Sequence, residues 1–292
     1  MKKNIIVVTG GAGFIGSCLI KYLTKLKIKE KIISIDNYSS GYSTNHVKNK
    51  NVKYIRGQNK DIEFLLKNYK KKIKLIYHFG EFSRIYQSFK SYKKCFEYNI
   101  HHSSKVIEFA KDNKIKLIYS ATSSNLGNGG KDENLSPYAW SKSKNIELIK
   151  NYNKWFGLKY EFVYFYNVYG PGQIMNSPMS AVIGIFEQQY KKNIPLTIVK
   201  PGTQKRDFTH IDDIVRGCYL AWKKGTQNHY MLGTKKNYSI IEIAKTFNTR
   251  IKYLPSRPGE RFGSTIPNDN AKKILGYSTS IDIKDYIKNL IK

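Results

Sequence analysis

Residues 5–17 read Ile-Ile-Val-Val-Thr-Gly-Gly-Ala-Gly-Phe-Ile-Gly-Ser. The stretch begins with four consecutive apolar residues, as in a buried strand. Apolar residues then recur every four positions, as on one face of a helix, at Ile15, Leu19 and Leu23. Three glycines separate the two patterns, at Gly10, Gly13 and Gly16. Glycines at this spacing turn the chain tightly, admit a pyrophosphate to the backbone, and let the helix pack closely on the strand. The stretch therefore predicts a strand, turn and helix unit whose helix start binds phosphate.

A second apolar strand follows at Ile32–Ile35 and ends in Asp36, about twenty residues after Gly16. A carboxylate at this place accepts hydrogen bonds from the two hydroxyls of an adenine ribose. A 2′-phosphate would be repelled by the same carboxylate, so the pattern favours NAD over NADP as the cofactor.

The rest of the chain continues to alternate apolar runs with amphipathic stretches. We expect further strands at 52–55, 75–79, 117–119 and 162–165, with helices between them. This alternation predicts an α/β fold, a Rossmann-type doubly wound parallel sheet covered on both faces. The 292 residues have room for that domain and a smaller one. We divide the chain into an NAD-binding Rossmann domain at 1–170 and a smaller C-terminal substrate-binding lobe at 171–292. One or two elements of the lobe should return to the main sheet.

The chain is strongly basic, with 51 Lys and Arg against 21 Asp and Glu and a formal net charge of +30. Such an excess occurs in proteins that bind nucleic acid or anionic membranes. Here the basic residues form short clusters between apolar segments, such as 70–72 and 191–192, without a long basic block. We therefore expect solvated surfaces, no nucleic-acid or membrane partner, and an anionic substrate such as a nucleotide diphosphate.

The three cysteines, Cys18, Cys95 and Cys218, have neither the spacing of a metal site nor that of paired disulfides. No apolar run approaches the roughly 20 residues of a membrane span, and Met1-Lys2-Lys3 leads directly into the first strand. These features predict a cytoplasmic protein without a metal site.

Hydroxyl groups gather after the strand at 117–119, in Ser120-Ala121-Thr122-Ser123-Ser124, where the strand should open onto the cofactor crevice. A helix should start after Ser136-Pro137 and carry Tyr138 and Lys142 on one face. A lysine ammonium beside a phenol favours the phenolate and lowers the phenol pKa from about 10. The pair is therefore a candidate general base.

With these residues the chain resembles the extended short-chain dehydrogenase/reductases, specifically the nucleotide-sugar epimerase/dehydratase family of the UDP-glucose 4-epimerase type. The resemblance runs from Lys3 to about Ile291. It rests on the segments 9–17 (TGGAGFIGS), Asp36-Asn37, His78-Phe79-Gly80, Asn99, 136–142 (SPYAWSK), 167–173 (NVYGPGQ), 202–208 (GTQKRDF) and 257–260 (RPGE).

The resemblance implies roles for the candidate residues. Tyr138 would take the proton from a sugar hydroxyl as hydride leaves the same carbon, Lys142 would hold the nicotinamide ribose, and Thr122 would hydrogen-bond the reacting oxygen. The residues lining NAD would be Gly10, Gly13, Phe14, Ile15, Gly16, Asp36, Asn37, Gln58, Asn59, Phe79, Gly80, Glu81, Asn99, Ser120, Tyr138, Lys142, Phe165 and Val168. The sugar nucleotide would be bound by Glu81, Thr122, Asn167, Arg206 and Arg257. A guanidinium suits a diphosphate, whereas a surface ion pair is the alternative for each arginine.

The chain also departs from the family pattern, mainly around the sugar. Gln58-Asn59 replaces an acidic residue facing adenine, Tyr164 stands where arginine is common, and the loop at 127–133 is short. Glu81 replaces a small residue, and we expect its carboxylate to border the nicotinamide and the sugar. There it would bond a sugar hydroxyl, pair with Arg84 or another cation, or take up a proton. Our hypothesis is that Glu81 selects the sugar; the alternative is that it points into solvent.

The preferred function is NAD-dependent epimerisation at C4 of a nucleotide sugar, through a transient 4-keto sugar. The runner-up is a 4,6-dehydratase, but such enzymes follow the catalytic threonine with Asp-Glu, whereas Ser123-Ser124 follows Thr122 here. A reductase or decarboxylase of the same fold, and a non-catalytic Rossmann nucleic-acid binder, are further alternatives. The resemblance also implies a homodimer formed by the helices at 99–110 and from Tyr138, with Phe109, Trp140 and Ile146 contributing.

Overall fold

The glycine-rich stretch forms the centre of a seven-stranded parallel sheet. The computed structural model describes residues 3–126, 132–260, 262–263 and 266–292, so most of the short loop at 127–133 lies outside the described residues. The strand order is β3-β2-β1-β4-β5-β6-β9, and every adjacent pair is parallel. The strands are β1 (Ile5–Thr9), β2 (Lys31–Asp36), β3 (Val52–Arg56), β4 (Ile73–His78), β5 (Lys116–Thr122), β6 (Tyr160–Phe165) and β9 (His229–Leu232). From β1 the chain first adds β2 and β3 on one side, and then β4, β5, β6 and β9 on the other side. This is the doubly wound arrangement.

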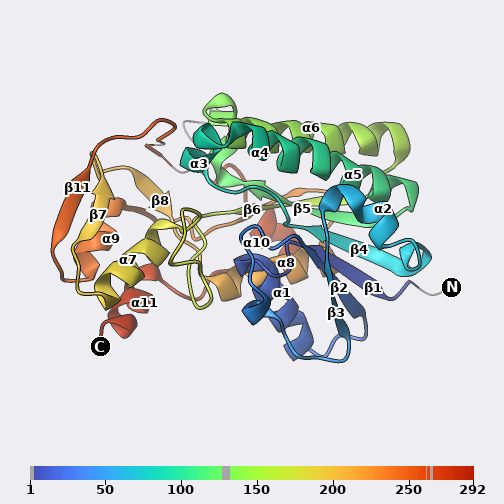
Figure 1. Cartoon of the computed structure of the whole chain (residues 1–292), viewed down its shortest axis with the longest axis horizontal. Helices are drawn as coiled ribbons and strands as arrows, with labels where there is room; N and C mark the ends of the chain where they lie inside the picture. The colour runs from blue at the N-terminus through green and yellow to red at the C-terminus, as the bar shows by residue number, and fades with distance from the viewer. Residues whose placement is uncertain (1–2, 127–131, 261, 264–265) are drawn as a thin grey trace.

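Helices cover both faces of this sheet (Figure 1). One face carries α1 (Phe14–Lys25), α8 (Ile211–Lys224) and α10 (Asn270–Leu275). The other carries α2 (Ile62–Leu65), α4 (Tyr92–Phe96), α5 (Ser103–Asp112) and α6 (Pro137–Phe156), with α3 (Ile85–Lys90) beside α6. All five residues of β1 are buried because its side chains meet helices on both faces. The predicted Rossmann-type fold is confirmed.

A smaller lobe lies beyond the carboxyl ends of the strands, on the left in Figure 1. Its elements are α7 (Val182–Lys191), β7 (Leu196–Val199), β8 (Lys205–Asp207), β10 (Asn237–Ser239), α9 (Ile240–Thr246), β11 (Ile251–Leu254) and α11 (Ile283–Leu290). Its two small sheets pair β10 with β8 and β11 with β7. The lobe has its own apolar core, which includes Phe186, Phe208 and Phe247. The chain returns from the lobe to the main sheet through α8 and β9, and again through α10, which packs on both. Three described elements therefore return, where we expected one or two.

Two local features differ from the sequence expectation. The helix expected at 99–110 begins as a π-helical turn, Glu97–His102, and continues as α5. Phe109, which we expected at a dimer interface, is only 3% exposed because it packs into the core of the main sheet. Phe109 is therefore a core residue and is not available to a partner subunit, whereas Trp140 is 37% exposed.

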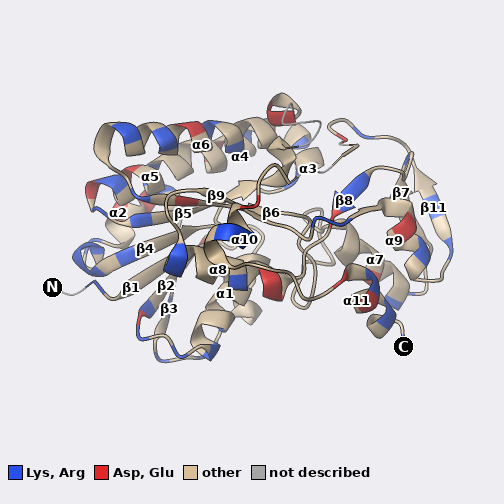
Figure 2. Ribbon diagram, turned by 180° about the vertical axis from the view of Figure 1, so that it is seen from behind, with Lys and Arg blue, Asp and Glu red and all other residues tan. Residues whose placement is uncertain are grey.

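The basic residues are spread over the molecule. In the view of Figure 2, Lys and Arg lie on helices of the main domain and on the smaller lobe, with acidic residues between them. Among the described helices, none combines the length and the apolar character needed to cross a membrane.

Candidate active site

A cavity of about 510 Å³ lies where the main sheet faces the lobe. Its walls include the carboxyl ends of β1, β2, β4, β5 and β6 and residues of the lobe such as Arg206 and Arg257. Parallel sheets of this kind bind ligands at this edge. All residues predicted to bind cofactor or substrate line the cavity, except Asn99.

The first wall is the glycine-rich turn between β1 and α1. Gly10 has φ +71°, and a Cβ there would lie 2.8 Å from Gly80 Cα. A Cβ on Gly16 would lie 2.2 Å from Gly10 O. Helix α1 has Gly13 as its N-cap residue, so it has no side-chain cap, and its first turn contains no acidic residue. Its first N–H groups and positive dipole end therefore remain available to a pyrophosphate.

Asp36 at the end of β2 fixes this turn. Its carboxylate accepts hydrogen bonds from Ala12 N at 2.9 Å and from Tyr38 N at 2.8 Å. Nearby, Asn37 Nδ2 donates to Gln58 Oε1 at 3.0 Å, and Asn59 Nδ2 donates to Gly80 O at 2.6 Å. The adenine end of the site is thus built from carboxylate and amide groups that also hold the loops in place.

A buried chain of hydrogen bonds leads from this turn toward the centre of the site. Thr9 Oγ1 accepts from the backbone N–H groups of Phe79 and Gly80, so its own proton is directed to His78 Nδ1 at 2.7 Å. His78 Nε2 then donates to Ser103 Oγ at 2.9 Å, a tautomer that we assign from the network. Burial lowers the pKa of His78 to about 4, so the ring is neutral near pH 7.

Ser103 connects this chain to Glu81. Glu81 Oε1 accepts from Ser103 Oγ at 2.9 Å, from Tyr119 OH at 2.9 Å and from Asn145 Nδ2 at 3.0 Å. Glu81 Oε2 pairs with Lys142 Nζ, and both side chains are only 3% exposed. Lys142 Nζ also lies 4.2 Å from the centre of the Tyr119 ring.

The cation that pairs with Glu81 is therefore Lys142, not Arg84. Both carboxylate oxygens are engaged by protein groups, so the structure matches the expected alternative in which Glu81 pairs with a cation other than Arg84, and not the one in which it bonds a sugar hydroxyl. It also differs from the solvated alternative. In the structure Glu81 acts on Lys142, the lysine of the pair that the sequence predicted to be catalytic.

Helix α6 carries that pair. Ser136 caps the helix by accepting a hydrogen bond from Ala139 N at 3.0 Å, and Pro137 occupies the first turn. Tyr138 N donates to Ser88 Oγ of α3 at 3.2 Å, which ties the start of α6 to the segment that follows Glu81. This cap and this contact place the phenol at the cavity.

The pKa of Tyr138 is raised to about 12, principally by burial. Hydrogen bonding with Thr122 and the charge of Arg84 oppose this rise, whereas the Glu81 charge adds to it. The sequence predicted the opposite direction, because it assigned a free ammonium to Lys142. The prediction was wrong, because burial raises the pKa of Tyr138 and the Glu81 charge raises it further.

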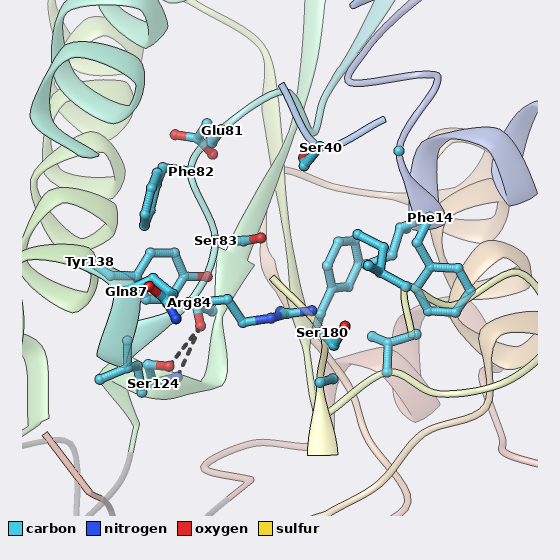
Figure 3. Close-up of a pocket in the computed structure, with 18 of the residues that line it drawn as sticks. Phe14, Ser40, Glu81, Phe82, Ser83, Arg84, Gln87, Ser124, Tyr138 and Ser180 are labelled. Carbon is cyan, nitrogen blue, oxygen red and sulfur yellow. Dashed lines mark hydrogen bonds between the residues drawn. The ribbon is translucent and has the colours of Figure 1, made fainter. Parts of the chain in front are cut away.

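Ser124 lies beside Tyr138 (Figure 3), and Thr122 hydrogen-bonds with the Tyr138 phenol. Thr122 Oγ1 accepts from Ser124 N at 3.1 Å and donates to Ser124 Oγ at 3.1 Å. Their hydroxyls therefore lie next to the phenol, at the carboxyl end of β5.

Asn99 lies behind the cavity wall. It is fully buried, accepts from Phe82 N at 2.7 Å and donates to Phe82 O at 3.1 Å and to Ser141 Oγ at 3.1 Å. The expected contact with the cofactor is replaced by one with the protein backbone, because the amide completes the hydrogen bonds of the segment after β4. Asn99 thus positions the residues around Glu81.

The remaining predicted substrate residues face the cavity from the lobe side. Asn167 Nδ2 donates to Asp207 O at 2.8 Å. Arg206 Nη2 lies 3.3 Å from Glu260 Oε2, and the Arg257 guanidinium lies 4.7 Å from the centre of the Tyr86 ring. The two arginines are partly held by protein groups and still line the cavity.

Several residues of the site were not found from the sequence. Ser103, Tyr119 and Asn145 bind Glu81, and no motif marks them because they come from α5, β5 and α6. Arg84 lines the cavity, and its Nε donates to Met179 O at 2.7 Å. We had considered Arg84 only as a partner of Glu81. Among the described residues, no group of His, Cys, Asp and Glu is arranged to hold a metal ion.

The family model described as the NAD dependent epimerase/dehydratase family matches residues 6–233. A dTDP-D-glucose 4,6-dehydratase of Dictyostelium discoideum is 31% identical over 82% of this chain, and the match spans 60% of that protein. A putative UDP-glucose 4-epimerase of Methanocaldococcus jannaschii is 28% identical over 98% of this chain and 97% of its own length.

A solved structure of an epimerase is also similar to this chain over almost its whole length. The UDP-glucose 4-epimerase of Thermotoga maritima, solved with UDP-glucose, superposes with a TM-score of 0.89 at 25% identity. The superposition covers 98% of this chain and 97% of that one. The uncapped start of α1 and the Asp36 carboxylate fit the NAD of this family, with the pyrophosphate at the helix start and the adenine ribose at the carboxylate.

Proposed function

Because this chain belongs to the NAD-dependent epimerase/dehydratase family, we propose that it is a nucleotide-sugar epimerase that inverts C4 through a transient 4-keto sugar. NAD, when bound, accepts a hydride from the sugar carbon and returns it. The residues of the chain must therefore bind the sugar nucleotide, remove and return one proton, and keep water away from the keto sugar.

Tyr138 is the group that moves the proton in this proposal. Its phenolate takes the proton of the C4 hydroxyl and returns it after the sugar has turned over. Thr122 hydrogen-bonds the same oxygen, and Lys142 holds the ribose of the cofactor next to Tyr138. Arg206, Arg257 and Asn167 bind the diphosphate, so the sugar is free to rotate while the nucleotide stays fixed.

The observation that carries the choice of epimerase over dehydratase is the state of the cavity carboxylates. Loss of water from C5 and C6 needs an acid and a base besides the tyrosine. The carboxylates among the described lining residues are Asp36, Glu81 and Glu260. Asp36 holds the glycine-rich turn, Glu81 pairs with Lys142, and Glu260 lies beside Arg206. Ser123 and Ser124 occupy the positions after Thr122, where a dehydratase has Asp-Glu.

The proposal extends to the setting of the enzyme. We assign the enzyme to the cytoplasm, since its cysteines are unpaired. We also propose that it is a homodimer, since Trp140 of α6 and Phe96 of α4 are exposed and pack edge to face, which gives the two helices a shared apolar surface. We assign the charge of +30 to solvated surface. Binding to nucleic acid should then be weak and disappear as the salt concentration rises.

The test is a panel of nucleotide sugars incubated with the purified protein and NAD, with products identified by NMR. Formation of the C4 epimer of one sugar supports the proposal. A keto-deoxy product or a pentose product would assign the chain to dehydration or decarboxylation instead.

A further inference from the structure

Arg84 has an unusual backbone conformation at the edge of the cavity. It precedes α3 with φ 146° and ψ 123°. The other described non-glycine residues with positive φ lie between 27° and 64°. Residues are held in such sparsely populated conformations only where the surrounding structure requires it, and they concentrate at ligand-binding sites.

The Arg84 guanidinium has no acidic partner among the residues that the structure describes. Its Nε donates to Met179 O at 2.7 Å, and no carboxylate of the described residues lies within 4.0 Å of it. Burial lowers the pKa of Arg84, which the nearby Tyr138 partly offsets. A cation taken out of water without a counter-ion is unfavourable, so this position favours an anionic ligand.

The other cations of the cavity are placed differently. Lys142 pairs with Glu81, and Arg206 lies beside Glu260. Arg257 rests on the Tyr86 ring at 4.7 Å. Arg206 and Arg257 are also the residues assigned to the substrate diphosphate. Arg84 is therefore a further cation, and the diphosphate already has two.

The position of Arg84 relative to Tyr138 identifies the part of the substrate it meets. The Ser88 to Tyr138 hydrogen bond fixes α3 against the start of α6, and Figure 3 shows Gln87, Arg84, Tyr138 and Ser124 together at one end of the cavity. The side chain runs from Tyr138 toward Ser180 of the segment that enters the lobe. The guanidinium at its far end still acts on the phenol, because the Arg84 charge lowers the pKa of Tyr138. We therefore place an anion held by Arg84 on the sugar ring, near the carbon whose hydroxyl Tyr138 deprotonates.

We propose that Arg84 binds a carboxylate at C5 of the sugar, so that the substrate is an acidic nucleotide sugar, a uronate. This inference rests on the proposed function, because Tyr138 must address the C4 hydroxyl. C5 is the ring carbon next to C4, which brings its carboxylate to the guanidinium. Gln87 and Ser124 supply further polar groups at the same end of the cavity.

The test compares the binding of two sugars that differ only at C6. UDP-glucose and UDP-glucuronate, and the dTDP pair, are titrated by calorimetry in the presence of saturating NAD. The protein carries Tyr138→Phe in every sample, so that turnover does not contribute heat. We expect the glucuronate to bind about tenfold or more tightly than the glucose, as is typical of a hydrogen-bonded charge pair.

Arg84→Gly is the informative variant. Glycine accepts the backbone conformation at this position without strain, so the melting temperature should stay equal or rise. The preference for the uronate should vanish, with little change in the affinity for UDP-glucose. Arg84→Lys keeps the charge and should retain part of the preference. Arg250→Gln is the matched control: it removes one exposed guanidinium from the lobe and should leave the preference unchanged.

The outcomes separate the two levels of the proposal. Loss of affinity for both sugars in Arg84→Gly would show that Arg84 binds the diphosphate. Equal affinity for both sugars in the protein that keeps Arg84 would show that the site does not recognise the carboxylate. Either result overturns the inference and leaves the epimerase proposal in place. If neither pair of nucleotide sugars binds at all, the proposed function fails and this inference fails with it.

Discussion

The Lys142 ammonium of α6 is paired with the Glu81 carboxylate in the segment that follows β4, and both side chains are almost completely buried. Glu81 also accepts hydrogen bonds from Ser103, Tyr119 and Asn145. The lysine of the catalytic pair therefore does not act on Tyr138 as an isolated positive charge. We therefore propose that Glu81 is a positioning residue, which holds Lys142 and raises the pKa of Tyr138.

We predict that Glu81→Gln shifts the pH profile of kcat/KM. Tyr138 must lose its proton to act as a base, so activity rises as the pH passes its pKa. The Glu81 charge raises that pKa. Glutamine removes this charge and leaves the Lys142 charge uncompensated, so the acidic limb should move to lower pH by about one unit.

The other titratable groups that face this cluster are His78 from β4, Cys95 from α4, Tyr119 from β5 and Arg84. None of them changes in the variant. Glu81→Asp should keep the limb near its original position, because it keeps the charge. Glu97→Gln is the control, since this carboxylate is 54% exposed and pairs with His102 at 3.5 Å. If the pH profile of Glu81→Gln does not shift, or if only KM rises, the prediction is contradicted and Glu81 is a residue that selects the sugar.

We predict that Asp36→Ala weakens NAD binding and relaxes the discrimination against NADP. The carboxylate is lost from the adenine ribose, and so are its bonds to Ala12 N and Tyr38 N. Asp36→Asn keeps an acceptor for the loop and removes the charge, so it should recover part of the NAD affinity while still accepting NADP. Calorimetry with both dinucleotides measures the effect. Preference of the unaltered protein for NADP would contradict this assignment.

We predict a homodimer at micromolar concentration. The exposed aromatic residues Tyr92, Phe96 and Trp140 lie on α4 and α6, which are neighbours on one face of the molecule (Figure 1). Trp140→Glu should give a monomer by light scattering, because it places a charge in the apolar contact. Phe64→Glu, at a residue 69% exposed on α2, should remain a dimer. A monomeric unaltered protein would rule out this interface.

The sequence was sufficient for the parts of the molecule that are encoded locally. The glycine spacing around Gly10, the apolar strands and the Ser136-Pro137 helix start each depend on neighbouring residues, and they predicted the parallel sheet and the start of α6. The strand at 117–119 extends to Thr122 in the structure. The short strands β8, β10 and β11 were not predicted, because three or four residues carry too little periodicity.

The electrostatics of the site could not be read from the sequence. The pKa of Tyr138 depends on burial and on Glu81, and hydrogen bonds join Glu81 to residues of α5, β5 and α6. The motif that contains Tyr138 and Lys142 does not reveal that a carboxylate from another part of the chain, Glu81, pairs with the lysine. Asn99 was misplaced for the same reason: its partner Phe82 becomes a neighbour only through folding.

The central claim is that Tyr138 drives inversion at C4 without loss of water. The most direct measurement is ¹H NMR of the accepted nucleotide sugar, in D₂O, with the unaltered protein and with Tyr138→Phe. We predict that the C4 epimer accumulates to equilibrium, that no deuterium enters C5, and that C6 keeps its substituent. Tyr138→Phe should bind NAD as well as the unaltered protein and turn over about 10²-fold more slowly or worse. A 4-keto-6-deoxy product with deuterium at C5, or a Tyr138→Phe protein with more than about a few per cent of the activity, would contradict the account.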